Sequence, residues 1–140
     1  MALAIAFLVR RGDAVAVYAG ALVGVVAVVS YGLTTRLFPD RFDYVDDPFN
    51  AYRLAEPLGD WNSFGLLAAI GAILALGVVA HARTTLPAVA AAAPLPVLAV
   101  ALYFTFSRGS WVALAFGVAI VVGLDPRRIR VLWSLAVVAP

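Results

Sequence analysis

Long apolar runs separated by short charged stretches dominate the pattern of this chain. Residues 14–33, 64–80 and 86–106 contain no charged side chain. Each run is close to the roughly 20 residues that an α-helix needs to cross the hydrocarbon core of a bilayer. The pattern therefore predicts three membrane-spanning helices, the third of them kinked because Pro94 and Pro96 lie near its middle.

A fourth apolar run, residues 111–124, is too short to span a membrane by itself. A helix of those residues would cover roughly 21 Å of a core that is about 30 Å thick. To cross the core, the helix must include residues 107–110 in its first turn, which places Arg108 at or just below the membrane boundary. We predict a fourth span over 107–124, carrying a charge that is costly unless it snorkels, pairs or faces a wet cavity.

Apolar segments at the two ends, residues 2–9 and 131–140, are shorter than a span. We interpret them as half-helices, and residues 1–140 as a single transmembrane region that is a fragment of a longer polytopic protein. The alternative is that both ends lie along the interface as short anchors. The predicted fold is all-α, a polytopic transmembrane helical bundle with about four full spans and partial helices at both termini.

Residues 36–62 form the one long polar segment between apolar runs. They include six of the eight acidic residues and three prolines. Because this length exceeds ordinary connections, we predict a functional or partly structured loop rather than a plain tether.

The composition agrees with a membrane protein, since 64% of the residues are hydrophobic and only 13% are charged. Cysteine is absent, which excludes disulfides, thiolate zinc sites and a cysteine nucleophile. All ten basic residues are Arg and the net charge is only +2, so a basic nucleic-acid surface is not supported.

Arginines separate the connections into two classes. One class has little acid and contains Arg10, Arg11, Arg83, Arg127, Arg128 and Arg130. The positive-inside rule places that class in the cytoplasm, so the 36–62 loop and Arg108 face the outside. Most aromatic residues fall at this outer face: Tyr31, Phe38, Phe42, Tyr44, Phe49, Tyr52, Trp61, Phe64, Tyr103, Phe104, Phe106 and Trp111. We interpret the outer face as an aromatic-lined site for an amphipathic substrate.

Arg108 is the first candidate for chemistry. Its neighbours Ser107 and Gly109 are small enough to let a ligand approach, and a guanidinium at the lip of an apolar bundle can hold a phosphate or diphosphate bidentately. The alternative is a snorkelling side chain at a helix end. Arg53 is a possible second contact, and its alternative is an ion pair with Glu56.

Other polar residues have simpler explanations. Asn62 or Ser63 can cap the helix that follows the loop, where backbone N–H groups would face an anion. The acidic residues at 43, 46 and 47 match no calcium-loop spacing, so no metal site is predicted. His81 is the sole histidine and is predicted at the cytoplasmic end, away from Arg108, so no catalytic residue is identified.

Two stretches resemble the O-antigen ligase and O-antigen polymerase family of bacterial membrane glycosyltransferases. Residues 103–111, Tyr-Phe-Thr-Phe-Ser-Arg-Gly-Ser-Trp, are similar to the signature Leu-Thr-x-Ser-Arg-Gly-Ala/Ser-Trp that opens the family's core domain. Arg53, followed by residues 59–62 and a helix that starts with small residues, is similar to the family's Arg and Gly-Asn-Pro-Asn, although Asp60-Trp61 stands in place of Asn-Pro.

The resemblance implies metal-independent transfer or polymerisation of glycan from an undecaprenyl-diphosphate-linked donor to a glycan or lipid acceptor. This chemistry belongs to cell-envelope polysaccharide biosynthesis at the outer face of the cytoplasmic membrane of a bacterium. The resemblance implies that Arg108 binds the donor diphosphate. We expect Arg53 as a possible second contact and Ser107, Gly109 and Asn62 in support. The expected partners are membrane lipid, donor and acceptor, with no cofactor, metal or nucleic acid.

The family's general base is a His in a large outer loop further along, to which His81 does not correspond. We therefore expect this piece to be inactive alone. Two alternatives stay open: a transporter or flippase segment for an anionic or lipid-linked substrate, in which the kinked helix and Arg108 line the path, and a non-catalytic membrane module in which Arg108 only snorkels.

Overall fold

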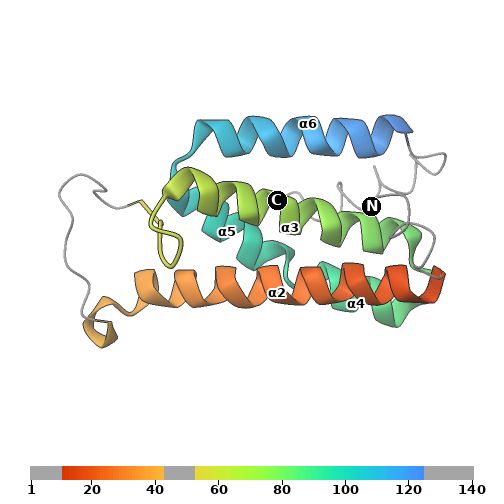
Figure 1. The fold of residues 1–140 in the computed structure, drawn as a ribbon, viewed down its shortest axis with the longest axis horizontal. Helices are drawn as coiled ribbons and strands as arrows, with labels where there is room; N and C mark the ends of the chain where they lie inside the picture. Colours follow the sequence, from red (N-terminus) through yellow and green to blue (C-terminus); the bar gives the residue numbers. More distant parts are fainter. Residues whose placement is uncertain (1–10, 43–52, 125–140) are drawn as a thin grey trace, which may run out of the picture.

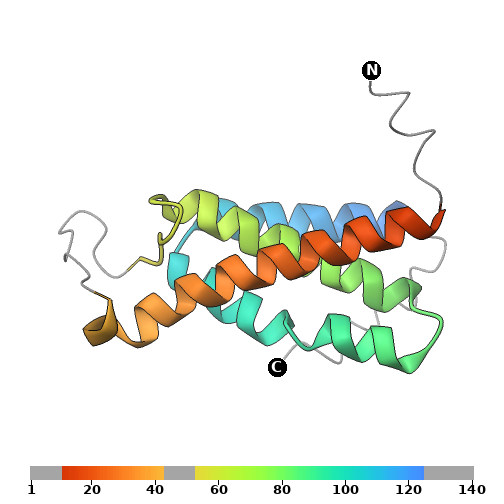
Figure 2. The ribbon, with the colours of Figure 1, turned by 60° about the horizontal axis from the view of Figure 1, so that its bottom comes forward.

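A computed structural model describes residues 11–42 and 53–124, and in these residues the chain is an all-α bundle (Figure 1). Its elements are α2 (Arg11–Leu37), the 3₁₀ turn η1 (Pro39–Arg41), α3 (Trp61–His81), α4 (Thr85–Ala92), α5 (Leu95–Thr105) and α6 (Arg108–Leu124). α2, α3 and α6 each run along the bundle, and α4 and α5 together make the return between α3 and α6 (Figures 1 and 2).

Three segments are long and apolar enough to cross a membrane: Ala16–Leu37, Trp61–His81 and Thr85–Thr105. These correspond to the first three predicted spans, and the protein is multi-pass by length and composition. The fourth predicted span is not among them, because within the described residues α6 has 17 residues and covers about 26 Å. The predicted half-helices at the two ends lie outside the described residues.

The predicted kink is present and divides the third span into α4 and α5. Pro94 lies in the turn between them, where it has no N–H to donate and its carbonyl accepts from the N–H of Leu98 at 3.0 Å. Pro96 lies in the first turn of α5, a position where the missing N–H costs no helical hydrogen bond. The break therefore begins a new helix rather than bending an old one.

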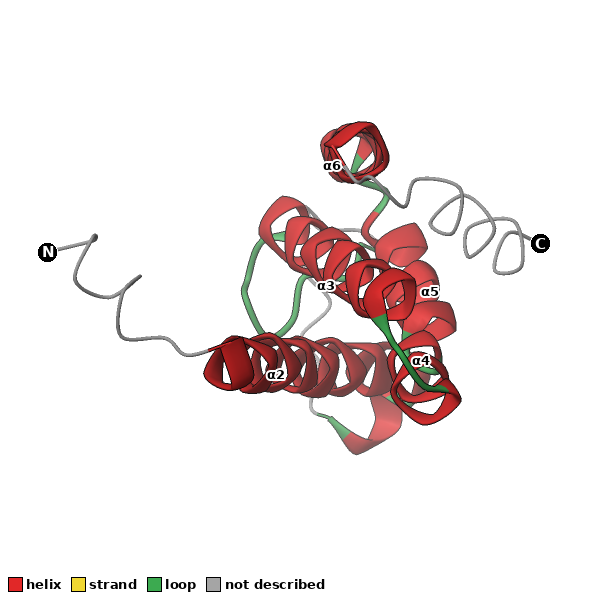
Figure 3. Cartoon of the chain, turned by 90° about the vertical axis from the view of Figure 1, so that its right-hand side faces the viewer, coloured by secondary structure: helices red, strands yellow, loops and turns green. Residues whose placement is uncertain are grey.

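α3 is the central helix of the bundle (Figure 3). Half of its spanning window is buried, compared with 22% for α2 and 28% for the α4–α5 segment. Its inward positions are mostly small, as at Ala68, Gly71 and Ala75, which allows close helix contact in lipid. At Gly71, a Cβ would lie only 2.7 Å from Cγ1 of Val25 on α2, so this crossing depends on glycine.

The main apolar core lies in the half of the bundle that contains the start of α3. It joins residues of α2, α3, α5 and the segment before α3: Val29, Leu54, Phe64, Ala68, Leu98, Ala101 and Leu102. α6 packs chiefly against α3 and stands apart from the other helices (Figure 3). Its far side is exposed and apolar at Val112, Phe116 and Ile120, as is usual for a helix surrounded by lipid.

Candidate functional site

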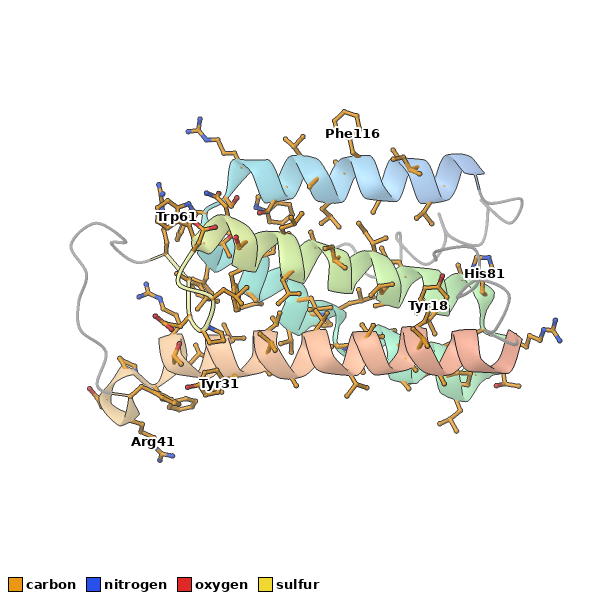
Figure 4. The ribbon with its side chains drawn as sticks, in the orientation of Figure 1. Tyr18, Tyr31, Arg41, Trp61, His81 and Phe116 are labelled. Carbon is orange, nitrogen blue, oxygen red and sulfur yellow. The ribbon has the colours of Figure 1, made fainter. Side chains whose placement is uncertain are left out.

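Four helix ends meet at one end of the bundle: the last turns of α2 and α5 and the first turns of α3 and α6 (Figure 1). The described parts of the 36–62 loop and Arg108 therefore share this end, as predicted from the Arg pattern. His81 lies at the opposite end from Trp61 (Figure 4), also as predicted. The acidic residues at 43, 46 and 47 lie outside the described residues, and the described ones contain no cluster of three or more metal-ligating side chains.

Residues 53–60 fold back onto the bundle end instead of hanging free. Leu54 and Ala55 are buried, and the N–H of Leu54 donates to the carbonyl of Phe104 at 2.9 Å, near the end of α5. This bond satisfies a carbonyl in the last turn of a helix, where no intrahelical partner is available. The prediction of a partly structured loop is confirmed for these residues.

Gly32 on α2 makes room for this segment. A Cβ at position 32 would collide with the carbonyl oxygen of Glu56 and lie 2.6 Å from the ring of Phe64. Neither group can move cheaply, because one is backbone and the other is a fully buried ring. The packing of the loop therefore depends on a glycine of a different element, helix α2.

Arg53 lies over the indole ring of Trp61, with the guanidinium carbon 4.7 Å from the ring centroid. The alternative of an ion pair with Glu56 is wrong, because no such pair forms between these two described residues. A cation–π contact uses the face of the guanidinium and leaves its edge N–H groups able to donate to a phosphate. Trp61 thus gives an exposed cation a defined position.

The N-cap of α3 is Asp60. The prediction that Asn62 or Ser63 caps this helix is therefore wrong. The Asp60 carboxylate accepts from the N–H of Ser63 at 2.7 Å. Hydrogen bonds from the side chain and then the backbone N–H of Ser63 hold the pKa of Asp60 below its ordinary value of 3.8. Because Asp60 caps the helix, Asn62 is available for a different contact.

Asn62 joins α3 to α6 through two serines, and we call Asn62, Ser107 and Ser110 the hydroxyl cluster. The Ser107 hydroxyl donates to Oδ1 of Asn62 at 2.8 Å and accepts from the N–H of Ser110 at 3.2 Å, which makes Ser107 the N-cap of α6. Oγ of Ser110 lies 2.8 Å from Oγ of Ser107 and 3.2 Å from the carbonyl of Asn62.

Both serines are almost completely buried, at 2% and 3% exposure, although Ser107 lies next to the exposed Arg108. Gly65 of α3 lets Ser110 approach, since a Cβ there would lie 2.5 Å from Oγ of Ser110. Supporting roles were predicted for Ser107 and Asn62, whereas Ser110 was not singled out from the sequence. Its signal was present in the spacing of Ser107 and Ser110, the N-cap and third residues of a helix.

Phe106 makes the sharp reversal between α5 and α6. Its φ of 49° lies in the left-handed region, which is unusual for a residue with a bulky side chain. The buried Thr105 supports the turn, because its hydroxyl donates to the carbonyl of Leu102 at 2.6 Å and accepts from the N–H of Ser107 at 3.3 Å. The turn delivers Ser107 to the bundle and Arg108 to the outside.

Arg108 is the first residue of α6 and is exposed. Within the described residues, its side chain makes no hydrogen bond, ion pair or ring contact. Gly109 is also exposed, and an added Cβ would find nothing closer than Oγ of Ser107 at 4.0 Å. Packing does not require glycine at position 109, so the space beside Arg108 is open.

Aromatic and guanidinium groups are interleaved over this end of the bundle. Arg36 lies 6.0 Å from the ring centroid of Phe104, and Arg41 lies 5.8 Å from that of Phe38. Tyr103 packs against both Phe104 and Phe106 with centroid distances of 5.6 Å. Phe64 departs from the prediction, because it is fully buried in the core and belongs to no surface site.

Comparison with protein-family models, curated proteins and solved structures finds no match for this chain.

Proposed function

We propose that this chain is part of an O-antigen ligase-like membrane glycosyltransferase, with Arg108 and Arg53 binding the diphosphate of a polyprenyl-linked glycan donor. The observation that carries the proposal is that two exposed guanidiniums, those of Arg53 and Arg108, lie at the same end of an apolar bundle. Within the described residues, neither Arg53 nor Arg108 donates a hydrogen bond to protein, so the N–H groups of both are available to a ligand. The sequence around both residues resembles the family's motifs.

The chemistry of the site suits a lipid-borne diphosphate. Guanidinium groups bind phosphate oxygens bidentately, and the first turn of α6 adds the partial positive charge of a helix N-terminus beside Arg108. Exposed apolar side chains of α5 and α6, such as Val100, Val112 and Phe116, lie along the same bundle and would contact the polyprenyl tail within the bilayer.

Transfer itself needs a group that accepts the proton of the attacking hydroxyl, and we assign none in this chain. His81 lies at the far end of the bundle, with Nδ1 2.9 Å from the carbonyl of Gly77. We therefore propose donor binding, without transfer, as the activity of these 140 residues. In the bacterial cytoplasmic membrane the site would face outward, because the opposite end carries the acid-poor Arg connections.

A transporter or flippase segment for an anionic or lipid-linked substrate is the second candidate, supported by the break at Pro94. A discontinuous spanning helix is typical of substrate paths in transporters. A non-catalytic module, with Arg108 only snorkelling, is the third. The two ligand-binding candidates, unlike the third, require that substitution of Arg108 weakens ligand binding.

The test is binding of undecaprenyl diphosphate to the 140-residue chain in lipid nanodiscs. We expect Arg108→Ala and Arg108→Lys to lose most binding, since Lys keeps the charge but not the bidentate geometry. Arg41→Ala is the matched control, because it removes the same charge from the same end. Equal binding by wild type and Arg108→Ala would overturn the proposal, and an equal loss in Arg41→Ala would reduce it to unspecific charge attraction.

Catalysis is tested separately in a complete parent protein that contains this region. Arg108→Ala and Arg108→Lys should abolish glycan transfer while the protein still inserts into the membrane. Movement of a lipid-linked substrate across proteoliposomes, without transfer, would favour the transporter instead.

A further inference from the structure

We infer that the hydroxyl cluster is a positioning device, in which Ser110, Ser107 and Asn62 help to fix the rotation of α6 and so aim Arg108 outward at the bundle end that also carries Arg53. The inference makes two claims: the cluster orients α6, and this orientation supports donor binding. The second claim rests on the proposed donor site. The first claim can be tested without any ligand.

The rotation of α6 is poorly determined by its apolar surface. Both its packed side and its lipid-facing side are apolar, for example at Leu114 and at Phe116. Because lipid is as apolar as a leucine side chain, burial of apolar surface hardly favours one rotation of the helix over another. One packing contact does restrict the rotation, since a Cβ at Gly117 would collide with the end of the Ile73 side chain of α3, but that flexible end can shift. Directional contacts therefore add to this packing in setting the rotation, and in the described residues the hydrogen bonds between α3 and α6 are those of the hydroxyl cluster.

The position of Ser110 within the first turn converts that rotation into a direction for Arg108. Successive residues of an α-helix are about 100° apart, so positions 108 and 110 are roughly 200° apart around the axis. With Ser110 buried against Gly65 of α3, Arg108 has to point away from the bundle, and it is exposed. Rotating α6 so that Ser110 leaves Gly65 would bring the Arg108 guanidinium toward the apolar core.

The cluster also connects the two cations through a short chain of contacts. Asn62, which bonds Ser107, follows Trp61 directly in the first turn of α3, and Arg53 lies over the Trp61 ring. Arg53 and Arg108 are therefore attached to the same pair of linked helix ends. This linkage limits how far the two guanidiniums can move relative to one another, as joint binding of one diphosphate would require.

The geometric test uses spin labels, for which the chain is well suited because it contains no cysteine. Labels at Leu58→Cys and Gly109→Cys report the distance across the site, since both positions are exposed. We expect Ser110→Ala to shift or broaden this distance distribution. A reference pair on α3 and α5, Leu66→Cys with Val100→Cys, should not change.

Thr35→Val is the matched control for loss of a buried hydroxyl. Thr35 is 6% exposed, and its hydroxyl bonds the carbonyl of Gly32 within its own helix at 2.7 Å, so it links no two elements. It should leave the 58–109 distribution unchanged. If Ser110→Ala does not insert, Asn62→Ala gives the same test, because Ser107 can still cap α6. An unchanged 58–109 distribution in the inserted cluster variant would overturn the inference.

The functional test is undecaprenyl diphosphate binding in nanodiscs. Ser110→Ala should weaken binding roughly fivefold, the effect of losing one hydrogen bond from the positioned state. Ser107→Ala should weaken it at least as much, because this hydroxyl also caps α6. Ser107→Thr, which keeps the hydroxyl, should restore it. Loss of binding in Arg108→Ala but not in the cluster variants would overturn the positioning role alone. Full binding in Arg108→Ala would overturn the proposed donor site, and the label distances would still decide whether the cluster orients α6.

Discussion

Gly32 offers the sharpest test of how the loop is held against the bundle, through the substitution Gly32→Ala. The added methyl would meet the carbonyl oxygen of Glu56 and, at 2.6 Å and 2.7 Å, two ring atoms of Phe64. Overpacking of this kind costs about 1–3 kcal/mol when the neighbours cannot move. Relief would require lifting the loop, which exposes Leu54, a residue whose complete burial is worth at most about 1.5–3 kcal/mol.

Gly20→Ala on the same helix is the matched control. Nothing lies within 4 Å of a Cβ at position 20, so this change should be neutral or stabilising by up to about 1 kcal/mol through helix propensity. We expect the two variants to differ by about 1–4 kcal/mol in the free energy of unfolding. The measurement is equilibrium unfolding of the 140-residue chain in mixed detergent micelles.

Cysteine accessibility gives a local readout of the same change. A cysteine at Ala55, which is buried next to Glu56, should react faster with a soluble thiol reagent in Gly32→Ala than in Gly20→Ala. Equal unfolding free energies and equal labelling rates in the two variants would refute the argument that Gly32 seats the loop.

Three further predictions concern the site. Asp60 has a lowered pKa, so its contribution to stability is complete above its ordinary value of 3.8 and is lost as the pH falls through the lower folded pKa. Asp60→Asn keeps a cap without a titrating group, so acid should destabilise this variant less than wild type in pH-dependent unfolding. Trp61→Leu should weaken undecaprenyl diphosphate binding about two- to fivefold by releasing Arg53, whereas Trp61→Phe should lose less, since an exposed cation–π contact is worth about 0.5–1 kcal/mol. In membrane vesicles, cysteines at Gly109 and Arg83 should react with impermeant reagents from opposite sides, and labelling from the same side would exclude the donor site.

The pattern of apolar and charged residues determined the secondary structure and the shared end of the bundle. Charge-free runs long enough to cross a bilayer have one low-energy conformation there, because every backbone polar group must be bonded internally. Alternation of such helices then places residues 53–60 and Arg108 at one end whatever the packing. Pro94 broke its helix for an equally local reason, the missing N–H.

Contacts between distant residues were decided only by the tertiary structure. The residues around Gly32 in the sequence do not predict its contact with the carbonyl of Glu56. Those around Ser110 do not predict its contact with Asn62, 48 residues earlier. Capping was similarly ambiguous, since Asp60, Asn62 and Ser63 all suit an N-cap and only the approach of α6 engages Asn62 elsewhere. In an apolar bundle most packing is interchangeable, so a few hydrogen bonds and glycine contacts select one arrangement, and these depend on three-dimensional proximity that the one-dimensional pattern does not contain.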